Sequence, residues 1–186
     1  KAQGREEQWI ALAPDRDAAY DQTIDIDLSE IEPLAAAPHS PGNIVRIRDL
    51  DLPVDQVMIG SCTNSSYVDL MTVAAMLKGR HLPPGISLGI APGSRQVLNS
   101  IARNGSLSDL ISFGARILES SCGFCIGNSM SPCTKSVSIR TSNRNFKGRS
   151  GTPSASVYLT SPVVAAASSL TGRITDPRDL GISYPR

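Results

Sequence analysis

Three cysteines of this 186-residue chain have the type and spacing of ligands to a metal centre. Cys62 stands apart, and sixty residues later Cys122 and Cys125 form a Cys-x-x-Cys pair in which Gly123 allows a tight turn. Thiolates bind zinc and iron–sulfur clusters, and four protein ligands normally close such a site. A site with only three protein ligands keeps one coordination position open for substrate. The count therefore predicts chemistry at a metal rather than electron storage or support of the fold.

Other readings of the cysteines remain open. The Cys-x-x-Cys pair by itself is also typical of a redox dithiol or of two free thiols. Cys133 follows eight residues after Cys125 and could be a fourth ligand, completing zinc or a closed cluster, although we interpret it as a bystander. The two histidines, His39 and His81, lie near prolines without ligand spacing to a cysteine, and we expect both in surface loops.

The run from Thr141 to Arg149 is dense in hydrogen-bond donors. Arg144 and Arg149 can each hold a carboxylate through two parallel hydrogen bonds, and Asn143 can donate to an anion or to a sulfide. A solvated basic turn is the plainer alternative. The phenylalanine and glycine inside the run favour a defined shape, so we expect a carboxylate-binding turn.

Strand and helix patterns alternate along the chain that carries these residues. The alternation predicts an α/β fold, a layered domain with a largely parallel sheet flanked by helices. In such a sheet, ligands bind outside the carboxyl ends of the strands. The loops that carry the three cysteines and the Thr141–Arg149 run each follow a predicted strand. The expected strands cover 57–59, 86–90, 115–119 and 137–140, and the expected helices cover 66–78, 94–103, 107–113 and 162–171.

Two details of these helices are open to test. Val68, Met71 and Ala75, with the neighbouring Ala74 and Leu77, have the spacing of a buried stripe on the helix over 66–78. Ser94 could be read as a nucleophile, but a serine that begins a helix is more simply a cap for its first turn.

The sequence predicts two parts. Residues 1–53 are expected to form a connecting and wrapping segment, and residues 54–186 a metal-binding α/β domain. Apolar and acidic residues alternate over 23–28, the pattern of a half-buried strand, and four prolines over 33–53 indicate extended chain. Because the first residue is Lys1, we expect the sequence to be a piece of a larger enzyme.

Composition excludes several classes of function. A net charge of +1 and 4% aromatic residues leave no electrostatic or stacking basis for nucleic-acid binding. No apolar run approaches the roughly 18 residues that span a bilayer, so we expect no membrane association. Four cysteines are too few for a disulfide scaffold and favour a reducing compartment, which predicts a cytoplasmic protein.

Four motifs, taken together and in order, resemble the aconitase superfamily, which includes aconitate hydratase, homoaconitase and the large subunit of 3-isopropylmalate dehydratase. The resemblance extends from about Tyr20 to Leu180 and implies the iron–sulfur domain type of that superfamily. The matching runs are Ile59–Ser66, Pro92–Ser94, Ser121–Gly127 and Thr141–Arg149.

The resemblance also implies a cofactor and roles for residues. A [4Fe-4S] cluster would be held by Cys62, Cys122 and Cys125, with its open iron binding the hydroxyl and a carboxylate of the substrate. Arg144 and Arg149 would bind carboxylates of a small tri- or dicarboxylate, and Asn143 would support the cluster. The activity implied is that of a hydro-lyase, which removes and re-adds water.

Among the members, the sequence around the cysteines favours aconitate hydratase, with 3-isopropylmalate or homoaconitate dehydratase as the alternative. An electron-transfer or zinc domain closed by Cys133, or an RNA-binding regulator, would be different classes. The general acid–base residues of the superfamily lie on other domains, and their motifs are absent here. We therefore expect the remaining domains or a small subunit as partners, and no dehydratase activity from this chain alone.

Overall fold

The computed structural model describes residues 4–182, in two units divided after Glu32. Within 4–32 the regular elements are two short 3-10 helices, η1 (Glu6–Gln8) and η2 (Leu28–Glu30). The predicted strand over 23–28 is wrong: residues 23–27 form no regular element, Leu28 begins η2, and Ile24 and Ile26 are exposed. A strand needs a hydrogen-bonded neighbour, and the described part of this unit contains no second strand.

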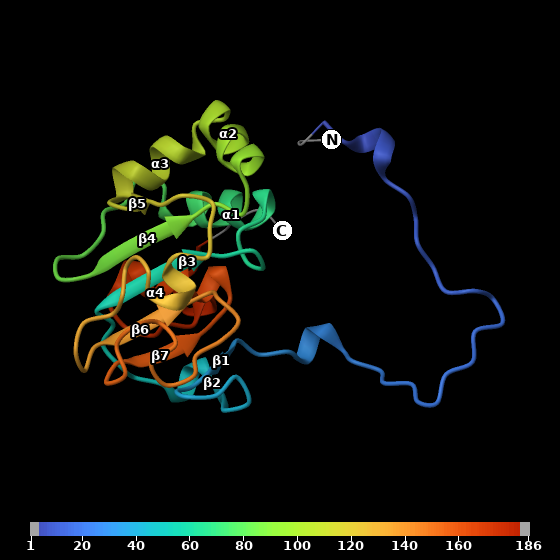
Figure 1. Cartoon of the computed structure of the whole chain (residues 1–186), viewed down its shortest axis with the longest axis horizontal. Helices are drawn as coiled ribbons and strands as arrows, with labels where there is room; N and C mark the ends of the chain where they lie inside the picture. The colour runs from blue at the N-terminus through green and yellow to red at the C-terminus, as the bar shows by residue number, and fades with distance from the viewer. Residues whose placement is uncertain (1–3, 183–186) are drawn as a thin grey trace. The chain divides into compact units, whose positions relative to one another are not determined.

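A seven-stranded sheet organises residues 33–182, with the strand order β2-β1-β7-β6-β3-β4-β5 (Figure 1). Strands β7, β6, β3, β4 and β5 are mutually parallel, whereas β1 is antiparallel to both β2 and β7. This largely parallel sheet with its helices confirms the predicted α/β fold. The strands are β1 (Leu34–Ala36), β2 (Ile44–Arg46), β3 (Gln56–Gly60), β4 (Ser87–Ala91), β5 (Arg116–Ile117), β6 (Val137–Arg140) and β7 (Ser156–Leu159).

The two faces of the sheet are covered differently. Alternate side chains such as Val57 and Ile59 belong to one large core shared with the helices, whereas Met58, between them, packs against Phe124 from an irregular loop. Helices therefore cover one face and a loop covers the other. The helices are α1 (Tyr67–Leu77), α2 (Arg95–Arg103), α3 (Ser106–Phe113) and α4 (Pro162–Thr171). None of the helices described is long and apolar enough to cross a membrane.

The helix over 66–78 was predicted correctly in extent and partly in its buried face, because Ala74 and Leu77 are buried as expected. Ser66 and Asp69 form a capping box, in which each side chain accepts from the backbone N–H of the other, at 3.2 and 2.9 Å. Val68 is 68% exposed, while Leu70 and Val73 are fully buried. Because α1 packs against both α3 and α4, its buried surface is wider than one stripe.

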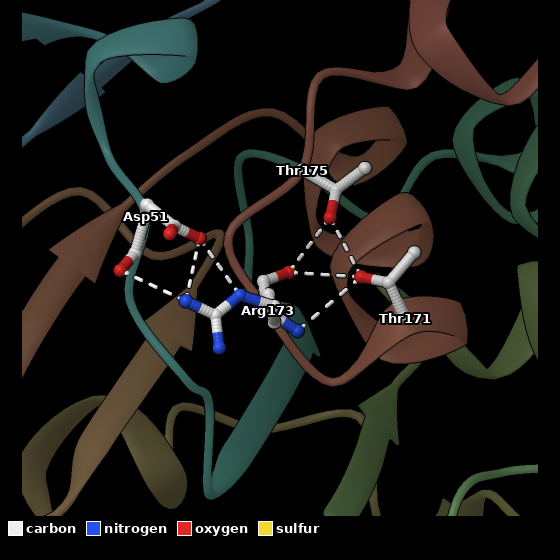
Figure 2. A network of polar contacts seen from close by, with 4 residues as sticks. All are labelled: Asp51, Thr171, Arg173 and Thr175. Atoms are coloured by element: carbon white, nitrogen blue, oxygen red, sulfur yellow. Dashed lines mark hydrogen bonds and ion pairs between the residues drawn. The ribbon is translucent and has the colours of Figure 1, made fainter.

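Residues 33–53 contribute the β1–β2 hairpin and the 3-10 helix η3 (Ile47–Asp49) to the sheet unit. Figure 2 shows how the end of this stretch contacts the segment after α4: Arg173 donates from Nε and Nη2 to one carboxylate oxygen of Asp51, at 2.7 and 2.5 Å. This ion pair is largely exposed, so its net contribution to stability is small. The boundary between residues 53 and 54 remains a prediction.

Replacement of Ser94 by alanine tests the cap against the nucleophile. Ser94 Oγ accepts a hydrogen bond from Val97 N at 3.1 Å at the start of α2. Loss of this bond leaves an unpaired donor in the first turn and should lower the free energy of unfolding by about 1 kcal/mol. Urea unfolding measures the change, and Ser94→Asp, which retains a capping oxygen, should restore stability. A nucleophilic role would instead leave stability unchanged in Ser94→Ala and abolish activity.

Candidate functional site

The candidate site lies where the parallel strands end. From β3 the chain proceeds to β4 on one side, and from β6 it proceeds to β7 on the other side, so the topology reverses between β3 and β6. Ligands of open α/β sheets bind in the crevice outside such a reversal. Cys62 follows β3 directly, and the Thr141–Arg149 run follows β6.

The loop after β3 is held by a threonine from the loop after β6. Thr141 Oγ1 accepts from Gly60 N at 2.8 Å and donates to Gly60 O at 2.9 Å, and Asn64 Nδ2 donates to Thr141 O at 2.6 Å. A Cβ at Gly60 would lie 2.3 Å from Ala91 O, so this close approach of β3 and β4 requires glycine. The two loops that flank the topological reversal are thereby connected.

The Cys122–Cys125 loop comes from the far edge of the sheet and folds over its loop-covered face. It contains the 3-10 helix η4 (Phe124–Ile126), and Cys125 N donates to Cys122 O at 3.1 Å. Phe124 is 1% exposed and packs on Met58 and Ala91, which anchors the loop beneath the strand ends. Burial of Phe124 therefore brings the Cys-x-x-Cys pair toward Cys62.

Close packing also joins this loop to the arginine turn. Gly127 has a φ of +76°, and a Cβ there would lie 2.6 Å from backbone atoms of Gly151. Neither position leaves room for a larger residue, because a Cβ at Gly151 would lie 2.4 Å from Ser131 Oγ. Backbone therefore lies against backbone between the two loops.

The three predicted ligand cysteines lie in one neighbourhood. Burial chiefly, together with the nearby Cys122 and Cys62, raises the pKa of the Cys125 thiol to about 11, while Arg140 acts in the opposite direction. Cys62 and Cys122 are exposed, and Cys125 is half-buried. Within residues 4–182, no three His, Cys, Asp or Glu side chains are close enough together to hold a metal ion. The ligand set therefore remains a prediction, although three neighbouring thiols are donors of the soft kind that iron–sulfur clusters use.

The arginine turn has one buried anchor and two exposed guanidinium groups. Asn145 is 1% exposed, and its Nδ2 donates to the carbonyl oxygens of Ala36, Ala37 and Val157 at 3.2, 2.9 and 3.1 Å. Arg144 and Arg149 are exposed. The turn is therefore a defined structure that presents cations to solvent, rather than a mobile basic run.

Asn143 connects the turn to the loop of the first cysteine. Its Nδ2 lies 3.5 Å from Thr63 Oγ1, and that hydroxyl lies 3.7 Å from Cys62 Sγ. The hydroxyls of Ser142 and Ser150, one on each side of the Asn143–Arg149 stretch, are buried and have no hydrogen-bond partner among the described residues. The arginine turn thus offers polar groups that could form hydrogen bonds with a ligand.

Cys133 precedes β6, whereas Cys62 follows β3 and the Cys122–Cys125 pair follows β5. Cys133 lines a cleft of about 530 Å³ together with Asp55, Gln56, Ser87 and Ser136, at or just before the amino ends of β3, β4 and β6. The same cleft is also lined by Ser129, Met130 and Ser131, from the loop that follows the Cys122–Cys125 pair. His39 and His81 are exposed loop residues, as predicted.

Sequence reasoning missed Arg140, the last residue of β6. Its side chain is fully buried and bonds to the Cys122–Cys125 loop. The available signal was an arginine at the end of the short predicted strand Val137–Arg140, beside the apolar Ile139.

The fold and the site define a class of protein: an α/β domain with a largely parallel sheet. Its candidate thiols and guanidinium groups lie in loops that follow the carboxyl ends of the strands. Residues 48–172 match the model of the aconitase family (aconitate hydratase), and the chain belongs to this family.

Curated relatives are similar over most of this chain. It is 41% identical over 175 residues to the 3-isopropylmalate dehydratase large subunit of Herpetosiphon aurantiacus, covering 93% of this chain and 41% of the relative. It is 42% identical to the same subunit of Clostridium beijerinckii, covering 91% and 41%. The homoaconitase large subunit of Thermus thermophilus is 43% identical, with 91% and 41% covered. The chain therefore spans about two fifths of the length of these relatives.

Proposed function

We propose that this chain is the cluster-binding and substrate-binding part of a hydro-lyase that acts on 3-isopropylmalate. One observation carries the proposal: the loops with the three cysteines and the two exposed arginines all follow the carboxyl ends of parallel strands, β3, β5 and β6, around the topological reversal. Membership of the aconitase family supports dehydration and rehydration of a hydroxy acid as the reaction.

The choice of substrate differs from our expectation from sequence. The sequence around the cysteines favoured citrate as substrate, whereas relatives at 41% and 42% identity are 3-isopropylmalate dehydratase large subunits. These relatives favour the alternative, and homoaconitase at 43% identity is consistent with a substrate range outside citrate.

In this proposal Cys62, Cys122 and Cys125 hold a [4Fe-4S] cluster, and Cys133 takes no part. When bound, the cluster supplies a Lewis acid that makes the substrate hydroxyl a better leaving group. Two of the three thiols are exposed, so substrate can approach from solvent at this edge. Without Cys133 the site has three thiols, one fewer than a closed zinc or electron-transfer site normally uses.

The arginine turn would bind and orient the substrate. Arg144 and Arg149 carry planar donor groups that pair with carboxylates through two hydrogen bonds each. The buried anchor at Asn145 holds the turn in place before substrate arrives, so little ordering is required on binding. Asn143, beside Thr63, would donate toward the cluster side of the site.

The proton-transfer groups would come from elsewhere. Among residues 4–182, no histidine lies at the site, since His39 and His81 are exposed in other loops. We propose that the rest of a longer polypeptide and a small subunit supply the general base, in line with the words "large subunit" in the names of the relatives.

A parallel assay tests this function. The polypeptide of full length, with its small subunit and after anaerobic reconstitution with iron and sulfide, is given 3-isopropylmalate, citrate and homocitrate. We expect kcat/KM for 3-isopropylmalate to exceed that for citrate at least ~100-fold, because a pocket shaped for an isopropyl group leaves an extra carboxylate unpaired. Equal or higher turnover of citrate would overturn the substrate assignment. The 186-residue chain alone should show no turnover.

A further inference from the structure

Arg140 is a buried cation with an unusual set of partners. It ends β6 on the loop-covered face of the sheet, and its exposed fraction is 0%. Removing a guanidinium from water is costly unless hydrogen bonds and an opposite charge compensate. The partners of Arg140 should therefore show what compensates the cost of burying its charge.

Every hydrogen-bond partner that the structure gives Arg140 is neutral. Nη1 donates to Phe124 O at 2.5 Å, and Nη2 donates to Met130 O and to Gln56 Oε1, both at 2.7 Å. Nε donates to Ser138 Oγ at 3.1 Å. Neutral acceptors satisfy the donors of the guanidinium but do not neutralise its charge.

Two of these partners belong to the loop that carries the Cys-x-x-Cys pair. Phe124 directly precedes Cys125, and Met130 lies further along the same loop. The guanidinium also lies 5.8 Å from the centre of the Phe124 ring. A single side chain thus joins two points of the cysteine loop to β3, through Gln56, and to β6.

We propose that Arg140 is a positioning residue for the cysteine loop, and that its charge is compensated by the anionic cluster. The second half rests on the proposed function, because three thiolates around an iron–sulfur core provide the negative charge that the neutral partners lack. Its hydrogen bonds fix the ligand loop, and its charge favours the reduced, more negative state of the cluster.

Three variants of the full-length polypeptide test the two halves separately. Arg140→Met removes donors and charge, and Arg140→Lys retains the charge but cannot span both carbonyls. Arg116→Met is the matched control, because Arg116 is exposed and donates to Met130 Sδ in the same loop, at 3.2 Å. Hydrogen exchange of residues 122–130 is measured without metal, and reduction potential and iron loss to a chelator are measured after reconstitution.

We expect amide exchange over 122–130 to accelerate at least ~10-fold in Arg140→Met while exchange in α1 is unchanged. Iron loss should accelerate about 10- to 100-fold, as for other residues that orient metal ligands. The potential should become more negative in Arg140→Met and stay near the wild-type value in Arg140→Lys. Arg116→Met should match the wild type throughout.

Unchanged loop exchange in Arg140→Met, or equal acceleration in α1, would overturn the positioning role. A wild-type potential in Arg140→Met would overturn the electrostatic role, as would a shift of equal size in Arg116→Met. If the wild-type protein takes up no iron and sulfide, the proposed function and the electrostatic role both fail, whereas the exchange measurement without metal still decides the positioning role.

Discussion

Replacement of Cys62 by serine should reduce the iron content of the reconstituted enzyme from about four per chain to near zero, with activity falling to background. Serine is a poor ligand for iron in a cluster site, and three thiolates leave no spare protein ligand. Cys62 is exposed and outside the core, so the fold should persist, with a change of less than about 0.5 kcal/mol in the free energy of unfolding. The same loss is expected for Cys122→Ser and Cys125→Ser.

Cys133→Ser is the matched control for these variants. Cys133 is also exposed, but it precedes β6, whereas Cys62, Cys122 and Cys125 follow the carboxyl ends of β3 and β5. Iron, acid-labile sulfide and visible absorption are measured after anaerobic reconstitution, and thermal unfolding is measured without metal. Loading that survives Cys62→Ser but is lost in Cys133→Ser would refute the three-cysteine ligand set.

Replacement of Arg149 or Arg144 by lysine should lower kcat/KM by about 10- to 100-fold for each arginine, the range expected when one charge-assisted bidentate contact is lost. Lysine retains the charge but donates from a single point, so it cannot reproduce the paired bonds to a carboxylate. Both side chains are exposed in a turn anchored by Asn145, so the stability and iron content of the protein should not change. Steady-state kinetics with 3-isopropylmalate measures the effect, and the division between kcat and KM tells whether binding or the transition state is affected.

Lys147→Met provides the control for the arginine variants. Lys147 is an exposed cation of the same turn, so its removal changes the local charge without touching either guanidinium. We expect kcat/KM within about twofold of the wild type, because a screened surface charge contributes little. A loss as large as that of the arginine variants would mean that the charge of the turn, and not paired recognition of a carboxylate, governs binding.

Local signals predicted many of the elements correctly. The capping serines Ser66, Ser94 and Ser161 each accept a backbone N–H three residues later, as their sequences indicated. Gly172 ends α4 in the left-handed conformation that glycine favours. Such features depend on hydrogen bonds between residues close in sequence, which is why the chain alone determines them.

Features that depend on distant partners were missed or misplaced. Strands β1, β2 and β7 were not predicted, because short strands such as β1 are stabilised mainly by neighbours from far along the chain. The alternation over 23–28 predicted a strand that has no neighbour in its described unit. The buried face of α1 was predicted only in part, because α3 and α4 cover it from two directions.

The sequence by itself determined the α/β class, the order of the motifs and the residues that could do chemistry. Only the tertiary structure decided how their loops are placed: Phe124 and Arg140 hold the Cys-x-x-Cys loop under the strand ends, whereas Cys133 precedes β6. The physical reason is that residue types and local caps are properties of short stretches. The neighbourhood of a thiol depends instead on strand order and on burial against residues far away in the chain.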